Sequence, residues 1–167
     1  GKKNHSNMKA VTLKEIKTEL SYRSYEDILK LCLQLTKFKK ENKELLTYLL
    51  FESENEEKFI DNVKLEIDEQ FDLINTKTYY FIKKSVRKIL RMIKKYIRYS
   101  KITETEVTLL IYFCEKLKNL NPSIKKNTVL LNIYNRELTN AKKKTEALHE
   151  DLQYDFEVIL NELLEFK

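Results

Sequence analysis

The chain has 167 residues, 42% of them hydrophobic, and a formal net charge of +6 at pH 7. This length and apolar content suffice for one domain with a buried core. Gly1 is the only glycine and Pro122 the only proline, which excludes the glycine-rich loops that cradle phosphates. No run of 18 apolar residues occurs, so no membrane-spanning helix is expected.

The predicted elements begin after a polar N-terminal segment. Residues 1–11 are expected to be a flexible tail, and residues 12–167 a single helical domain. A short helix is predicted from Leu13 to about Leu20, with Thr12 as its N-cap. Ser24 then precedes a helix with an apolar stripe at helical spacing, formed by Ile28, Leu31, Leu35 and Phe38. This stripe is expected to pack against other helices.

The middle of the chain is predicted to contain four more helical segments. Apolar residues recur at spacings of three and four in residues 43–52, 56–74, 79–99 and 103–120. Thr103 and Glu106 have the spacing of a capping box, and Asn121 and Pro122 are expected to start the following helix. Short connections between long helices are typical of antiparallel neighbours.

The C-terminal segment, 128–166, carries one apolar stripe without a glycine or proline to interrupt it. As a single helix it would be roughly 58 Å long, and residues 139–145 are the expected place for a bend. Its last part forms a candidate self-association seam, because an apolar seam can pair two helices. We call this the α-helical seam, and its residues are Leu148, Leu152, Phe156, Ile159 and Leu163.

The segment 79–99 is predicted to be a two-faced helix. On a helical wheel its aliphatic residues occupy an arc of roughly 100°, and eight basic residues occupy an arc of roughly 140° on the opposite side. The candidate surface for an acidic partner or a polyanion, here called the basic stripe, consists of Lys84, Arg87, Lys88, Arg91, Lys95 and Arg98. Acidic residues concentrated in 52–72 are expected to pair with some of these cations and to leave a residual positive stripe.

Three interpretations of the basic stripe remain open: a solvated face, a contact for an acidic protein, and a contact for nucleic acid. Nucleic acid would bind through phosphate contacts that are independent of sequence and sensitive to salt, and Tyr99 could stack on a base. A membrane surface is not expected, because the opposite face of this helix is aliphatic and has no tryptophan anchor.

One set of carboxylates has the spacing of a known enzyme motif. Glu54 and Glu57, followed by Glu69 and Asp72, are similar to the paired motifs of all-helical nucleotide pyrophosphohydrolases, over fewer than twenty residues. In that family the two motifs lie on separate antiparallel helices. Here both lie on or beside one helix, so we expect them to form an acidic flank without a catalytic cleft.

The remaining reactive residues do not form a predicted site either. Glu146 and His149 have the Glu-x-x-His spacing of di-iron sites, but such sites need a second pair, and the only other histidine is His5. Cys32 and Cys114 lie in apolar helical runs, which is typical of buried thiols in a reducing compartment. We therefore expect no enzyme activity, no metal and no cofactor.

The sequence as a whole predicts an all-α fold. We expect six or seven mostly antiparallel helices, in an irregular bundle or a short stack of helical hairpins, with a long C-terminal helix. The favoured function is a non-enzymatic cytoplasmic scaffold or adaptor that binds another protein, with a homodimer left open. The alternative is a nucleic-acid-binding module that uses the helix 79–99 without sequence preference.

Overall fold

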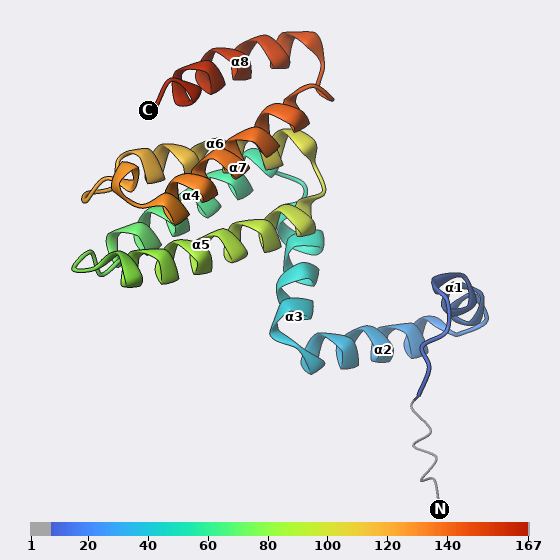
Figure 1. The fold of residues 1–167 in the computed structure, drawn as a ribbon. Helices are drawn as coiled ribbons and strands as arrows, with labels where there is room; N and C mark the ends of the chain where they lie inside the picture. Colours follow the sequence, from blue (N-terminus) through green and yellow to red (C-terminus); the bar gives the residue numbers. More distant parts are fainter. Residues whose placement is uncertain (1–7, 167) are drawn as a thin grey trace, which may run out of the picture. The chain divides into compact units, whose positions relative to one another are not determined.

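The computed structural model describes residues 8–166, and this part of the chain forms eight α-helices and no strand (Figure 1). The predicted all-α class is confirmed, with more helices than the six or seven expected. Contacts divide the chain into two compact units, Gly1–Leu46 and Thr47–Lys167, where the sequence predicts one domain. Among the described residues, no helix has the length and apolar character needed to cross a membrane.

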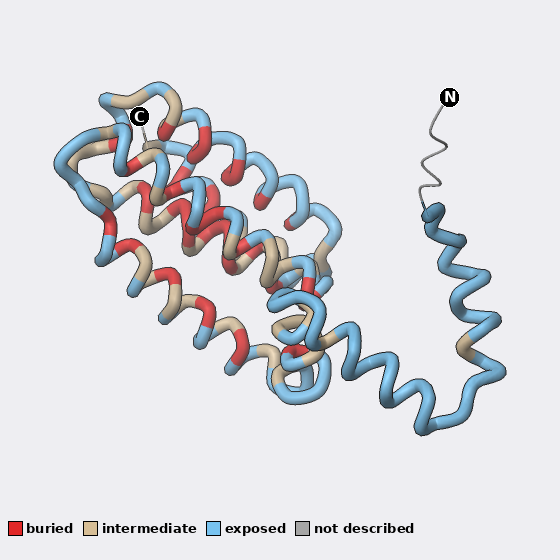
Figure 2. The backbone as a smooth tube through the Cα atoms, turned by 90° about the horizontal axis from the view of Figure 1, so that it is seen from below, coloured by how far each residue is buried: buried red, intermediate tan, exposed pale blue. Residues whose placement is uncertain are grey.

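The N-terminal unit is built from α1 (Leu13–Ser21), α2 (Tyr25–Phe38) and α3 (Lys40–Thr47), which ends at the boundary between the units. Thr12 and Glu15 form a capping box at the start of α1, and the Ser24 side chain caps α2. None of these three helices contains a buried residue (Figure 2). Residues 1–7 of the predicted tail lie outside the described residues.

The expected packing of the α2 stripe against other helices is therefore wrong. Ile28, Leu31, Leu35 and Phe38 are all exposed, at 37%, 42%, 61% and 77%. The periodicity that predicts α2 is correct, since the helix forms where expected. Helical periodicity shows which side of a helix is apolar, but it does not show that another part of the same chain covers that side.

The C-terminal unit begins with a π-helical turn and contains five α-helices and a short 3₁₀ turn. In chain order they are Tyr48–Glu52 (π), α4 (Glu56–Asp72), α5 (Tyr79–Ser100), α6 (Thr103–Lys118), Ile124–Lys126 (3₁₀), α7 (Thr128–Thr145) and α8 (Glu150–Leu164). Helices α4 and α5 run antiparallel beside each other, and α6 contacts α4, α5, α7 and α8 (Figure 1). Half of the residues of α6 are buried, as a central position requires.

Helix α5 has the two faces that its sequence predicts. Ile82, Val86, Ile89, Leu90 and Ile93 are all buried, with at most 6% of each exposed. The basic residues lie on the opposite side, where most of them are exposed. Because burying one such aliphatic side chain contributes about 1.5–3 kcal/mol, this face anchors α5 to the unit.

Helix α6 begins at Thr103 as predicted, but the capping box expected there is absent. Thr103 and Glu106 do not form a capping box, because Ile102 occupies the N-cap position and Thr103 is already the first residue of α6. Helix α5 ends at Ser100, and Lys101 follows it in the left-handed conformation (φ 58°). The chain turns there within two residues, which places Thr103 inside the first turn of α6. The Ser100 hydroxyl accepts a hydrogen bond from the Ile102 N–H at 3.3 Å and closes this turn.

One predicted helix start is wrong, because no α-helix begins at Asn121 and Pro122. The 3₁₀ turn follows instead, and its Ile124 is fully buried. Tyr79 donates a hydrogen bond to the Ser123 carbonyl at 2.7 Å. The segment thus forms a short 3₁₀ turn, and α7 starts later, with Asn127 as its N-cap.

The segment 128–166 forms two helices, and the chain turns at residues 146–149, after the expected bend at 139–145. Helix α7 continues through 139–145 because Ala141 and Thr145 are buried against its neighbours. The Gln153 side chain donates to the Leu148 carbonyl at 2.6 Å and to the Glu146 carbonyl at 3.1 Å. The turn brings α8 back onto α7 and α6, so no helix of 58 Å extends from the fold.

Candidate interaction surfaces

The basic stripe is present on the outside of α5. Lys84, Arg87, Lys88, Arg91 and Arg98 are exposed, and none of these five forms an ion pair within residues 8–166. The sixth predicted member, Lys95, is half-buried, with its Nζ 5.6 Å from the centre of the Tyr96 ring. From Lys84 to Arg98 the stripe extends about 21 Å along the helix.

The positive charge of the stripe arises from segregation of charge within the C-terminal unit. Residues 47–167 contain 21 basic and 20 acidic residues, so the unit is almost neutral. Helix α5 nevertheless has eight basic residues and no acidic one, whereas α8 has five acidic residues and no basic one. The N-terminal 46 residues, with 11 basic and six acidic residues, supply most of the net charge of the chain.

The aromatic residue that heads the stripe is Tyr80. The expected stacking residue, Tyr99, is only 9% exposed, because its position on α5 turns it toward the inside of the unit. Tyr80 is 66% exposed and lines a shallow hollow with Lys83, Lys84, Arg87 and Arg91. Tyr80 precedes Lys84, Arg87 and Arg91 by 4, 7 and 11 residues, which places the four side chains on one face of the helix. This spacing in the sequence already indicates that Tyr80 belongs to the same face as the stripe.

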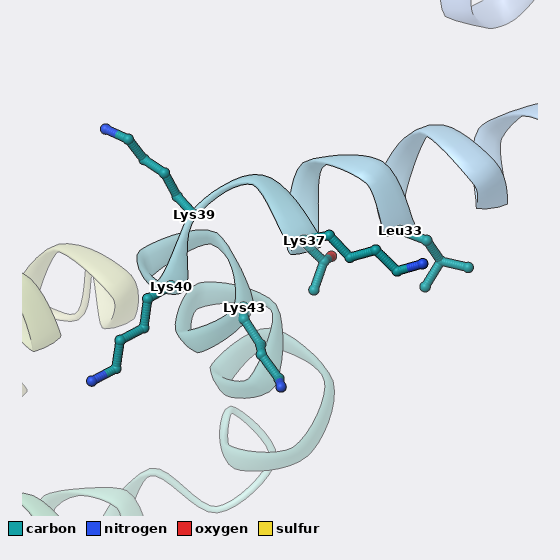
Figure 3. A pocket seen from close by; sticks show the side chains of 6 residues that line it. Leu33, Lys37, Lys39, Lys40 and Lys43 are labelled. Carbon is teal, nitrogen blue, oxygen red and sulfur yellow. The ribbon is translucent and has the colours of Figure 1, made fainter.

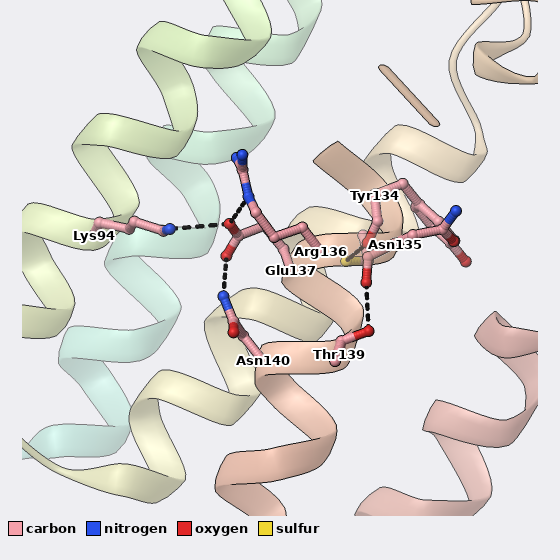
Figure 4. A network of polar contacts seen from close by, with 8 residues as sticks. Lys94, Tyr134, Asn135, Arg136, Glu137, Thr139 and Asn140 are labelled. Atoms are coloured by element: carbon pink, nitrogen blue, oxygen red, sulfur yellow. Dashed lines mark hydrogen bonds and ion pairs between the residues drawn. The ribbon is translucent and has the colours of Figure 1, made fainter. Parts of the chain in front are cut away.

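Lys94 forms an ion pair with Glu137, a carboxylate that the sequence analysis did not single out. Glu137 of α7 is fully buried, and its Oε1 lies 2.9 Å from Lys94 Nζ and 3.1 Å from Arg136 Nε (Figure 4). Asn140 Nδ2 donates to Glu137 Oε2 at 3.4 Å. This network connects α5 to α7, and a buried charge needs such partners. No spacing in the sequence links Glu137 to Lys94, which is 43 residues away.

The acidic residues of α4 accept hydrogen bonds mainly from hydroxyl groups. Tyr96 donates to Glu66 Oε2 at 2.7 Å, and Ser100 donates to Glu56 Oε2 at 2.9 Å. In both of these contacts between α4 and α5 the donor is a hydroxyl group.

The carboxylates that resemble a pyrophosphohydrolase motif, Glu54, Glu57, Glu69 and Asp72, are all exposed. The described part of the chain contains no group of three or more His, Cys, Asp or Glu residues that could hold a metal ion. His149 accepts a hydrogen bond from the Asp151 N–H at 3.3 Å and caps α8. The geometry gives these residues structural or solvent-facing positions.

The α-helical seam lies largely against the rest of the C-terminal unit. Leu163 is 3% exposed, and Ile159 is 36% exposed. Leu148, Leu152 and Phe156 are half-buried. Leu160, which was not assigned to the seam, is 1% exposed and packs inward beside Leu163. The side of α8 that carries the seam therefore contributes to the fold, and its use in self-association stays a prediction.

Among the described helices, α2 has the largest number of exposed large apolar side chains. Eight of its residues occupy an arc of about 220° on the helical wheel, about twice the width of the apolar stripe on an ordinary surface helix. We call this the α2 face. Its residues are Tyr25, Ile28, Leu29, Leu31, Cys32, Leu33, Leu35 and Phe38.

The C-terminal end of α2 carries a group of lysines. Leu33, Thr36, Lys37, Lys39, Lys40 and Lys43 line an open hollow where α2 meets α3. Figure 3 shows the lysine side chains diverging from one another. Lys40 Nζ lies 4.0 Å from Glu44 Oε1. The opposite end of the helix starts with Glu26 and Asp27, so α2 is acidic at its beginning and basic at its end.

Comparison with protein-family models, with curated proteins and with solved structures finds no match to this chain. Its surfaces are therefore interpreted from their own chemistry. The two that stand out are the apolar α2 face and the basic stripe of α5.

Proposed function

We propose that this chain is a non-enzymatic helical scaffold or adaptor that binds another protein through the α2 face. The observation that carries the proposal is a helix that is apolar over most of its circumference and contains no buried residue. A helix of 14 residues is marginal in water without tertiary packing. Burying one leucine or phenylalanine contributes about 1.5–3 kcal/mol, so a partner that covers this face would gain substantial free energy.

The contrast with the C-terminal unit supports the proposal. Helix α4, of similar length, buries Phe59, Val63, Ile67 and Phe71 within its own unit. Helix α2 has eight apolar residues, two more than α4, and buries none. Large exposed apolar patches typically mark interaction sites on folded proteins. The lysines beside the α2 face would favour a partner that presents carboxylates at that end.

The test compares two substitutions at adjacent positions. Leu35→Glu places a charge on the α2 face, and Gln34→Glu makes the same charge change on the polar side of the helix. Affinity capture with the whole chain as bait should retain the same proteins for wild type and Gln34→Glu, and lose them for Leu35→Glu. Circular dichroism should be the same for all three. Identical captured proteins in all three would contradict the proposal.

A second candidate function, binding of single-stranded nucleic acid, is favoured by one specific observation. Five exposed cations that form no ion pair within residues 8–166 follow one side of α5, and the exposed ring of Tyr80 heads the row. Phosphate contacts by a basic groove together with stacking on aromatic rings are the usual means of binding single strands. In this arrangement Lys84, Arg87 and Arg91 would contact phosphates and Tyr80 a base.

This second candidate is tested by titrating a labelled oligonucleotide at two salt concentrations. Arg87→Glu with Arg91→Glu should abolish binding, whereas Lys142→Glu with Lys143→Glu, the matched charge change on exposed residues of α7, should leave most of it. Tyr80→Ala should weaken binding by about 1–3 kcal/mol. No binding at low salt, or equal loss in both double variants, would rule this candidate out.

A further inference from the structure

We propose that the basic stripe of α5 binds the acidic outer side of α8 on a second copy of the chain. We call this outer side the acidic face, and its residues are Glu150, Asp151, Asp155, Glu157 and Glu162. The contact joins two different surfaces, so it is head-to-tail and leaves one surface of each kind free on every pair. It does not involve the α2 face and goes beyond the function proposed for that face.

The acidic face points away from the core of its own unit. On a helical wheel its five carboxylates occupy an arc of about 160°, centred opposite Leu160 and Leu163, the buried residues of α8. Tyr154 and Val158 lie near the middle of this arc and are 70% and 48% exposed. The face therefore presents exposed carboxylates on both sides of a small apolar strip.

Neither surface is neutralised within residues 8–166. The members of the acidic face that form no ion pair there are Glu150, Asp155, Glu157 and Glu162. Asp151 Oδ2 lies 3.7 Å from His149 Nδ1, but this nitrogen accepts a hydrogen bond from the Asp151 N–H and so carries no proton. Five cations of the basic stripe are also unpaired within the same residues. Each surface can therefore pair with a surface of the opposite sign.

The two surfaces match in length and in kind. The acidic face extends roughly 18 Å along α8 from Glu150 to Glu162, and the basic stripe extends about 21 Å along α5. Each lies on the outer side of one helix, and each includes an exposed tyrosine, Tyr154 or Tyr80. Two helices laid along each other can pair several of these charges at once. Such a network stabilises a contact more than an isolated surface ion pair does.

The arrangement of the C-terminal unit favours a second copy as the partner. Figure 1 shows α5 and α8 on opposite sides of this unit, and α6 contacts both of them. The two surfaces therefore face outward in different directions, and they meet only between two copies. Because residues 47–167 contain 21 basic and 20 acidic residues, two such units have almost no net charge to oppose their approach. The same near-neutrality gives a nucleic acid little long-range attraction to this unit.

The pairing is tested by disabling one surface at a time in the whole chain. Arg87→Glu with Arg91→Glu disrupts the basic stripe, and Asp155→Lys with Glu162→Lys disrupts the acidic face. Each double variant alone should self-associate about tenfold more weakly than wild type in sedimentation equilibrium at low salt. An equimolar mixture of the two should form a one-to-one dimer and nothing larger, because the intact stripe of one meets the intact acidic face of the other.

Two controls separate this contact from other kinds of association. Lys142→Glu with Lys143→Glu changes the net charge by the same amount as the stripe variant, but on α7, and should associate as wild type does. Leu35→Glu on the α2 face should also leave this association unchanged. Wild type should form species larger than a dimer as its concentration rises, and these should dissociate at about 1 M salt, where the screening length is about 3 Å.

Three results would overturn the inference. They are a monomer at every concentration at low salt, association that survives Arg87→Glu with Arg91→Glu, and a mixture of the two double variants that forms no dimer. If the wild-type monomer instead bound a labelled oligonucleotide through Arg87 and Arg91, the basic stripe would belong to the second candidate function. The function proposed for the α2 face would stand in each of these cases, because its own test uses Leu35→Glu.

Discussion

The two cysteines have opposite environments. Cys32 is exposed, against the expectation of a buried thiol, and Cys114 is fully buried, with its Sγ 3.8 Å from the Tyr134 carbonyl oxygen. Burial raises the pKa of the Cys114 thiol, with a further contribution from the negative charge of Glu137. The thiolate is the reactive form, so burial and the raised pKa both protect Cys114 from thiol reagents.

We expect iodoacetamide to modify Cys32 and to leave Cys114 unmodified in the native protein at mildly alkaline pH. Both should react once the protein is unfolded in guanidinium. Mass spectrometry of tryptic peptides measures each site separately. Equal modification of the two sites in the native protein would show that the interior around Cys114 opens readily.

Tyr112 gives a prediction for alkaline pH. Burial, followed by the hydrogen bond that the phenol donates to Asp68, raises the pKa of Tyr112 from 10.0 to about 12. Between these pH values the folded protein keeps the phenolic proton that the unfolded chain loses. Its contribution to stability is therefore complete below pH 10.0 and is lost as the pH rises through about 12.

Tyr112→Phe should accordingly weaken the decline in unfolding free energy over this alkaline range. Tyr154, which is 70% exposed, provides the control, because Tyr154→Phe should leave the decline unchanged. Urea denaturation at a series of pH values measures the effect. A decline of the same steepness in both variants would mean that other groups cause it.

At the scale of helices, Glu137 is the polar connection between α5 and α7. Its carboxylate contacts one cation from each helix, and both cations are about half exposed. If the carboxylate is removed, Lys94 and Arg136 can turn to water. The cost is therefore chiefly the loss of hydrogen bonds to a charged group.

Glu137→Gln should lower the free energy of unfolding by about 1.5–3 kcal/mol. Glu157→Gln, on the exposed side of α8, makes the same change in charge and should have little effect. Chemical denaturation of both variants gives the difference. An equal effect would indicate that net charge, and not the contact between α5 and α7, determines the change.

The sequence predicts helices well where one narrow apolar face meets one neighbour. Helix α5 is of this kind, and its five central aliphatic residues are buried as expected. The turn between α7 and α8 was placed too early, because residues 139–145 have few apolar side chains but continue the helix through buried Ala141 and Thr145. In that segment the tertiary contacts of two small residues outweigh the polar pattern around them.

The candidate sites were predicted only in part, for two physical reasons. The cations of the basic stripe follow from helical spacing, and five of the six are exposed as expected. Lys94 is paired with Glu137 through a contact that depends on how α5 and α7 pack. The α2 face was expected to be covered within the fold, because an apolar pattern does not specify whether its partner belongs to the same chain.

At the scale of the whole molecule, every buried residue of the described chain lies between Tyr48 and Leu163. The unit 47–167 thus forms its core from its own residues. We expect a fragment of residues 47–167 to fold and to show a midpoint of thermal unfolding close to that of the full chain. A fragment that is unfolded, or that melts far below the full chain, would show that the N-terminal residues contribute to this core.

The same fragment illustrates a consequence of the separation of charge between α5 and α8. Its positive and negative side chains nearly cancel in number, yet each sign is gathered on its own helix. A charged chromatography resin binds the local charge of the protein surface that it contacts and does not respond only to the net charge of the protein. At neutral pH and low ionic strength, the fragment should adhere both to a sulfonate matrix through α5 and to a quaternary-amine matrix through α8.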